Sequence, residues 1–249
     1  MCGRCDDAGP DGHAMHRRAA LRFGAAGLAA LGLGFGAQML PRAAWAASGA
    51  ATTKTPDEAL AGLKAGNERY LADPQHCTID LAKQRDAVAA SQAPWASIVS
   101  CADSRVPPEL IFGGLGLGEL FVARNAGNLV DTATLGTIEY GAAVLGSPLV
   151  VVLGHSRCGA VAAACDVVAK NATYPGAIGP MIAPILPAAL AVRDKAGDFV
   201  VNATAESARR TAARLRAVSA LLADLADAGK LKIVAAVYDL DSGVVTYLN

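Results

Sequence analysis

Residues 148–153 read Pro-Leu-Val-Val-Val-Leu, an uninterrupted apolar run that ends at Gly154 and is followed at once by His155. A strand with one face in water alternates apolar and polar residues, so a continuous run of this kind indicates a parallel strand covered on both faces. Apolar runs alternate with helical patterns along the rest of the chain. We therefore expect an α/β fold with a mostly parallel central β-sheet flanked by helices.

The segment Thr55-Pro56-Asp57-Glu58 has the features of a helix N-terminus: a capping threonine, a proline and acidic residues in the first turn. Further patterns place helices at residues 55–73, 79–90, 132–145, 158–168 and 203–228, with a short helix after Pro107 and a proline-broken one at 178–192. Strands are expected at 97–100, 119–123, 148–153, 232–237 and 244–247, with a hairpin turn at 241–243. Four arginines of the 203–228 helix indicate a solvated face or a subunit contact: Arg209, Arg210, Arg214 and Arg216.

The N-terminal region predicts export. Arg17-Arg18 is followed by an uncharged segment rich in Ala and Gly, residues 23–41, and then by Ala44-Trp45-Ala46. This order is typical of a cleaved twin-arginine signal peptide, so we expect residues 1–46 to be removed and residues 47–249 to form one domain. The twin-arginine export machinery would deliver it to the periplasm or cell envelope. An uncleaved membrane anchor is the alternative, and Met15 is an alternative translation start.

Composition excludes some functions and narrows the search for a site. The chain has 22 Lys and Arg against 22 Asp and Glu, and only 5% of its residues are aromatic. No basic patch is visible, so nucleic-acid binding has little support. Beyond residue 46 the chain has few side chains that bind transition metals: Cys77, Cys101, Cys158, Cys165, His76 and His155.

Three of these side chains are placed where strands are expected to end. Cys101 and His155 each follow a predicted strand, and Cys158 lies in the first turn of the next helix. Binding groups collect at the carboxyl ends of parallel strands. Two thiolates and one imidazole are three of the four ligands that Zn²⁺ takes, and the open fourth position is typical of a catalytic site. The alternative is a buried thiol pair beside a core histidine.

Asp103 and Arg105 favour the catalytic interpretation, because a charged pair beside a strand end of an apolar chain requires a reason. Zinc lowers the pKa of bound water to about 7 and so produces a nucleophile at neutral pH. We expect Arg105 to hold Asp103 ionised and oriented. Asp103 would then accept a hydrogen bond from the zinc-bound hydroxide.

Four motifs together resemble the β-class carbonic anhydrases: Cys-Ala-Asp-Ser-Arg at 101–105, Arg-Asn-Ala-Gly-Asn at 124–128, Ile-Glu-Tyr-Gly at 138–141 and Gly-His-Ser-Arg-Cys-Gly-Ala at 154–160. The resemblance extends from Asp57 to Leu248. It implies reversible hydration of carbon dioxide to bicarbonate and a proton, with one Zn²⁺ per subunit. It also implies a homodimer, or a multiple of dimers, with active sites at the subunit interface.

The resemblance also assigns residues. Cys101, His155 and Cys158 match the zinc ligands, and Asp103 and Arg105 match the catalytic dyad. Four further residues match positions that line the substrate site: Gln92, Phe121, Tyr140 and Gly159. Gln92 could instead be a turn residue, and Phe121 and Tyr140 could be core residues. The family members in which the aspartate binds zinc at low pH carry Trp where this chain has Ile98, so we expect Asp103 to be off the metal near neutral pH.

The remaining cysteines have weaker interpretations. We expect Cys165 to be a small core residue and His76-Cys77 to lie in a surface loop, and a Cys77–Cys165 disulfide is conceivable in an oxidising compartment. Two alternatives to carbon dioxide hydration stay open. One is hydrolysis of carbon disulfide or carbonyl sulfide by the same zinc chemistry, and the other is a zinc-binding or redox-sensing protein without catalysis.

Overall fold

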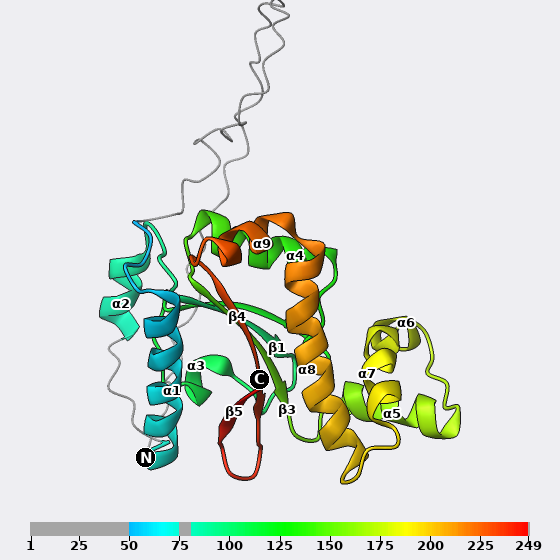
Figure 1. Cartoon of the computed structure of the whole chain (residues 1–249). Coiled ribbons are helices and arrows are strands. Elements are labelled where there is room, and N and C mark those ends of the chain that lie inside the picture. The colour runs from blue at the N-terminus through cyan, green and yellow to red at the C-terminus, as the bar shows by residue number, and fades with distance from the viewer. Residues whose placement is uncertain (1–49, 75–80, 249) are drawn as a thin grey trace, which may run out of the picture. The chain divides into compact units, whose positions relative to one another are not determined.

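The structure, a computed structural model, describes residues 50–74 and 81–248. Its centre is a 5-stranded sheet in the order β2-β1-β3-β4-β5 (Figure 1). β1, β2, β3 and β4 run parallel, and β5 pairs antiparallel with β4. The strands are β1 (Ala96–Cys101), β2 (Leu120–Asn125), β3 (Leu149–His155), β4 (Lys232–Tyr238) and β5 (Val245–Leu248). The expected α/β class with a mostly parallel sheet is confirmed.

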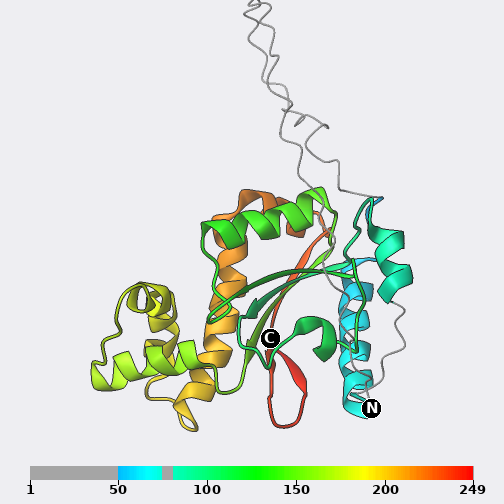
Figure 2. The ribbon, with the colours of Figure 1, turned by 180° about the vertical axis from the view of Figure 1, so that it is seen from behind.

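Helices lie on both faces of this sheet, and Figures 1 and 2 show α1 and α8 on opposite sides of it. α5, α6 and α7 lie beside α8, away from α1. The α-helices are α1 (Pro56–Ala72), α2 (Leu81–Val88), α3 (Pro108–Ile111), α4 (Thr132–Glu139), α5 (Gly159–Lys170), α6 (Ile178–Ile182), α7 (Leu186–Val192), α8 (Phe199–Val218) and α9 (Ala220–Asp227). A π-helix, η2 (Tyr140–Val144), follows α4, and a 3-10 helix, η3 (Ala183–Ile185), joins α6 to α7.

The apolar run of β3 is buried on both faces. Leu149 and Val151 pack in a cluster with Leu63 of α1 and with residues of α3, whereas Val150 and Val152 pack with α8 and α9 on the other side. Each strand residue therefore meets a helix whichever way it points. This explains why the run has no polar alternation.

α1 is fixed against the sheet by its sequence. Thr55 and Glu58 form the capping box expected at its start. Gly66 has no side chain, and the carbonyl oxygen of Phe112 occupies the space that a Cβ would need, so α1 packs closely against the end of α3. The neighbouring Asn67 is buried and binds two other segments: its Nδ2 donates to the carbonyls of Ile111 (3.1 Å) and Gly243 (2.9 Å), and its Oδ1 accepts from the Val245 N–H (2.9 Å).

Several expected boundaries were wrong. β2 continues to Asn125 and β3 continues through Gly154 to His155, because pairing with neighbouring strands extends both ladders. The helix expected at 132–145 changes to a π-helix at Tyr140. The helix expected at 203–228 is interrupted at Ser219, whose extended backbone ends α8 and whose hydroxyl accepts the Leu222 N–H at the start of α9. Local periodicity does not reveal these tertiary effects.

No helix in the described ranges is both long and apolar enough to span a membrane. The predicted signal peptide lies outside the described residues.

Replacing Asn67 with alanine tests the role of this buried amide. The Asn67→Ala variant leaves the backbone groups of Ile111, Gly243 and Val245 without their partner, so we expect the free energy of unfolding to fall by about 3 kcal/mol. Chemical denaturation monitored by circular dichroism measures it. The control is Asn202→Ala, which removes one exposed hydrogen bond to the Ala196 carbonyl; an equal loss in both variants would contradict the prediction.

Candidate metal centre

The carboxyl ends of β1 and β3 bring the three predicted ligands together. These strands are neighbours, with Ser100 level with Leu153, so Cys101 and His155 leave the sheet at the same edge. Cys158 is the N-cap residue of α5. The ligand atoms of Cys101, His155 and Cys158 all lie within 4.8 Å of one another, and all three residues are buried. The two sulfur atoms are 4.0 Å apart.

The ring of His155 is oriented for metal binding. Its Nδ1 lies 2.9 Å from the carbonyl oxygen of Ser156, which can only accept, so Nδ1 carries the proton and donates. Nε2 then presents a lone pair to the sulfur atoms. It is fully buried and has no hydrogen-bond partner among the described residues. A buried ring nitrogen without a partner does not suit a satisfied core histidine, and it suits a metal ligand.

The two thiols interact strongly. The hydrogen bond between their sulfurs lowers the pKa of Cys101 and raises the pKa of Cys158, and burial raises the pKa of Cys158 further. The backbone N–H of Gly127 donates to the Cys101 sulfur over 3.4 Å, which favours its thiolate. A divalent cation between the sulfurs would stabilise both thiolates. Two thiolates and a neutral imidazole are the donors of a Cys₂His zinc site, so the residues present fit this metal.

Asp103 and Arg105 lie beside this cluster. The Arg105 guanidinium binds both carboxylate oxygens of Asp103, with Nε 2.9 Å from Oδ1 and Nη2 2.7 Å from Oδ2, and its backbone N–H also donates to Oδ1. The side-chain hydrogen bonds from Arg105 hold the pKa of Asp103 well below its usual range. Oδ2 of Asp103 is 3.9 Å from Nε2 of His155. The ionised carboxylate therefore faces the position where the ligand atoms converge.

Arg124 is a residue of the site for which the sequence suggested no role. Its Nε donates to the carbonyl of Cys101 over 2.9 Å, and its Nη2 donates to the carbonyl of Asp103 over 2.6 Å. Arg124 thus holds the segment from Cys101 to Asp103 against β2. This segment carries one candidate ligand and the carboxylate. Its place in the Arg-Asn-Ala-Gly-Asn motif, at the end of a strand, was the available signal.

The four predicted substrate residues fall into two groups. Gly159 follows Cys158 at the start of α5, where an added Cβ would meet nothing within 4 Å. Phe121 is level with Ser97, at the amino end of β1, and its ring centroid is 6.0 Å from that of Tyr140. Gln92 precedes β1 and lines a hollow with Gly118, which lies just before the amino end of β2. Within one chain, the structure does not bring Gln92, Phe121 or Tyr140 to the cysteine cluster.

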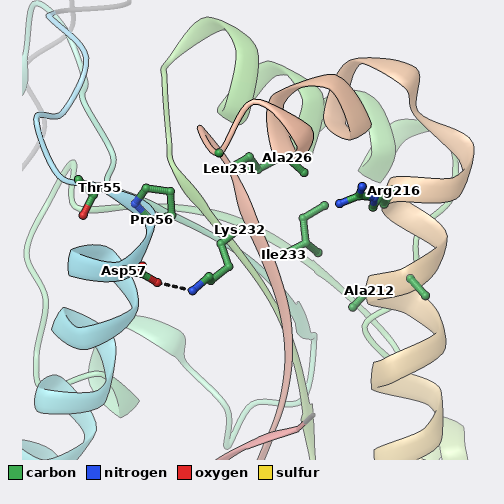
Figure 3. Close-up of a pocket in the computed structure, with 11 residues that line it drawn as sticks. Thr55, Pro56, Asp57, Ala212, Arg216, Ala226, Leu231, Lys232 and Ile233 are labelled. Atoms are coloured by element: carbon green, nitrogen blue, oxygen red, sulfur yellow. Dashed lines mark hydrogen bonds and ion pairs between the residues drawn. The ribbon is translucent and has the colours of Figure 1, made fainter.

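A cavity of about 630 Å³ lies away from the metal centre, at the amino end of β4 (Figure 3). Alanines of α8 and α9 line it together with Leu231 and Ile233. Its charged side chains are already paired, Lys232 with Asp57 and Arg216 with Asp227. Because none of its described lining residues is a cysteine or histidine, we place the chemistry at the strand ends instead.

Cys165 is buried and free, as expected for a core residue, and burial raises its pKa to about 11. It is not part of the ligand cluster. The arginines of α8 are exposed, and Arg210 pairs with Glu206. His76 and Cys77 lie outside the described residues, as does the conceivable disulfide to Cys77.

The chain is similar to proteins of a known family. The sequence profile of the carbonic anhydrase family matches residues 96–245. The chain is 41% identical to carbonic anhydrase 2 of Mycobacterium tuberculosis over 190 residues, which cover 76% of this chain and 90% of that protein. It is 36% identical to a carbonic anhydrase of Mycolicibacterium smegmatis, covering 76% of this chain and 92% of the relative.

Solved structures share the fold. A β-carbonic anhydrase of Aspergillus fumigatus superposes with a TM-score of 0.62 at 23% identity, covering 76% of this chain and 90% of the other. A tetrameric β-carbonic anhydrase of Sordaria macrospora gives a TM-score of 0.60 at 22% identity, covering 78% and 96%. The family profile, the bacterial relatives and the shared fold agree with the cluster at the strand ends: this chain belongs to the β-class carbonic anhydrase family.

Proposed function

We propose that this protein is a zinc-dependent enzyme that hydrates carbon dioxide reversibly to bicarbonate and a proton. The observation that carries the proposal is the buried Cys101, His155 and Cys158 cluster. Within the described part of the chain, Nε2 of His155 has no hydrogen-bond partner, and it faces the sulfurs beside an ionised Asp103. The names of the relatives support the reaction, and the donor set supports the metal.

The three ligand residues would hold Zn²⁺ with a fourth position open. When bound there, zinc supplies a Lewis acid that brings the pKa of a coordinated water to about 7 and so provides the nucleophile. Asp103 would accept a hydrogen bond from that nucleophile and aim its lone pair at the substrate carbon. Both oxygens of Asp103 are already bound by Arg105, which supports a carboxylate that stays off the metal near neutral pH.

We further propose that two copies of the chain complete each active site. β2 is at one edge of the sheet. If two β2 strands paired antiparallel about their centres, the partner subunit's Phe121 would come level with Arg124 and so with Ser100, one residue before Cys101. Strands lie about 4.8 Å apart and rise about 3.3 Å per residue. The backbone of the partner subunit's Phe121 would therefore be about 10 Å from Cys101, whereas the backbone of Phe121 in the same chain is about 14 Å from it. The partner subunit's Tyr140 would approach the same site, because the ring centroids of Phe121 and Tyr140 are 6.0 Å apart within one chain.

An apolar surface adjoins that edge. Leu81, Leu110 and Leu117 are 56%, 53% and 45% exposed. They line a hollow of about 430 Å³ together with Leu120, the first residue of β2. An apolar surface that continues into a strand edge with no neighbouring strand among the described residues supports pairing between copies of this chain.

Export remains a proposal that rests on Arg17-Arg18 and Ala44-Trp45-Ala46. The full chain would be cleaved after residue 46 and act in the periplasm or cell envelope, which fractionation of expressing cells can check.

Replacing a ligand tests the metal and the reaction together. The parent, as residues 47–249, should contain about one zinc per chain and hydrate carbon dioxide in stopped-flow assays. In Cys101→Ala we expect zinc to fall well below one per chain and hydration to approach the uncatalysed rate. Cys165→Ala, which alters a buried thiol outside the cluster, should keep both. A parent with full zinc but no hydration would overturn the proposed reaction, and the same sample can be assayed for sulfide release from carbon disulfide.

Asp103→Asn should retain zinc and lose about 100-fold in hydration rate, because a neutral amide accepts the nucleophile's hydrogen bond more weakly than a carboxylate and forms no ion pair with Arg105. The depressed pKa of Asp103 means that its carboxylate contributes at every pH above that low value and is lost only as the pH falls through it. The fold-loss in hydration rate should therefore be the same at about pH 6.5 and at about pH 8.5. Asp166→Asn, at an exposed pair with Lys170, is the control.

Mixed subunits test the shared site. Phe121→Ala should lower hydration by about tenfold if its ring positions substrate across the interface. Co-expressing Phe121→Ala with Cys101→Ala should then restore activity, because one site of each mixed dimer has both an intact cluster and an intact Phe121. Cys101→Ala with Asp103→Asn should not, because these residues belong to the same end of one chain. Equal outcomes for both mixtures would contradict a composite site.

A further inference from the structure

The loop from His155 to Cys158 carries two of the three ligands and is fastened to the turn between β4 and β5. The N–H of Ser156 donates to the carbonyl of Tyr238 over 2.9 Å. The hydroxyl of Ser156 accepts the N–H of Leu240 over 2.8 Å. The ligand loop therefore rests on the C-terminal hairpin and is not held by β3 and α5 alone.

Arg157, in the middle of this loop, has a left-handed backbone with φ of 56°. A residue with a Cβ pays about 1–2 kcal/mol for that conformation. The turn is required here, because the chain must pass from the end of β3 to the N-cap of α5 while both ligands point to Cys101. Its side chain reaches the hairpin: Nη1 lies 2.6 Å from Oδ2 of Asp241, and Nη2 lies 2.9 Å from Oδ1.

Asp241 lies in a turn that several hydrogen bonds hold in place. The carboxylate of Asp239 accepts hydrogen bonds from the N–H groups of Asp241 and Ser242 and from the Ser242 hydroxyl. Gly243 and Val245 are bound by the buried Asn67 of α1. The Arg157–Asp241 pair thus connects the ligand loop to a turn that the core holds in place.

We propose that Arg157 is a positioning residue whose bidentate pair with Asp241 holds the ligand loop closed and slows the release of the metal. The inference rests on the zinc binding proposed above. The pair is exposed, with 55% and 73% of the two side chains accessible, so it adds little to global stability. The pair instead slows the opening of the loop that carries His155 and Cys158. Metal release depends on this opening, because the metal leaves only when these two ligands separate from Cys101.

The test is zinc release from the holoprotein into an excess of a chromophoric chelator. In Asp241→Ala we expect release to be about 3- to 10-fold faster, with an unchanged melting temperature. The matched control is Glu206→Ala, which breaks the exposed pair with Arg210 on α8 and should release zinc at the parental rate. Raising sodium chloride to about 1 M should speed release from the parent toward that of Asp241→Ala, because salt screens an exposed pair.

Two further variants separate the ion pair from the backbone. Arg157→Gly removes the side chain but favours the left-handed turn, and it should also release zinc faster. The exchanged pair, Arg157→Asp with Asp241→Arg, keeps opposite charges and a residue that tolerates the left-handed region, so it should return toward the parental rate.

Parental release rates in both Asp241→Ala and Arg157→Gly would overturn the inference, and so would an exchanged pair no slower than Asp241→Ala. A parent that binds no zinc would instead overturn the proposed function. In cobalt-substituted protein, the thiolate-to-metal bands should be the same in Asp241→Ala and parent at equilibrium and decay faster on chelation in the variant.

Discussion

Parallel pairing between β1 and β3 is the interaction on which the site depends. Val99 lies level with Val152, and both belong to the apolar layer that packs against α8 and α9. Because the side-chain period of a strand is two, this register also determines the direction in which Cys101 and His155 point where the strands end. Slipping either strand by one residue would turn its ligand to the other face. The hydrophobic core therefore sets the geometry of a polar centre that lies at its edge.

The charges at the carboxyl ends of β1 and β3 favour a divalent cation. Two buried sulfurs 4.0 Å apart repel each other as thiolates, and the Gly127 N–H offers only partial relief. The carboxylate of Asp103 adds negative charge. Arg105 binds both of its oxygens, which keeps the carboxyl ionised and directs it toward the guanidinium. These hydrogen bonds occupy both oxygens, as the proposed open fourth position would require.

Support for the ligands comes from parts of the chain that are far away in sequence. Arg124 binds the carbonyls of Cys101 and Asp103, and the β4–β5 turn binds Ser156 and Arg157. Asn67 of α1 holds the same turn from the other side. Groups that hold metal ligands in place commonly matter almost as much as the ligands themselves. These contacts hold in place two strand ends and a helix N-cap, which together present the three candidate ligands within a small space.

The fold class, the start of α1 and the three candidate ligands could be predicted from the sequence, because hydrophobic periodicity, caps and strand-end residues are local properties. Three features needed the folded chain: the ligand atoms meet within 4.8 Å, Nε2 of His155 has no other described partner, and Phe121 and Tyr140 lie at the opposite end of β1 from Cys101. The tertiary structure also revealed Arg124 and the Arg157–Asp241 pair, whose partners are far away in the chain. The physical reason is that register and packing between distant segments set these distances, and no local pattern encodes them.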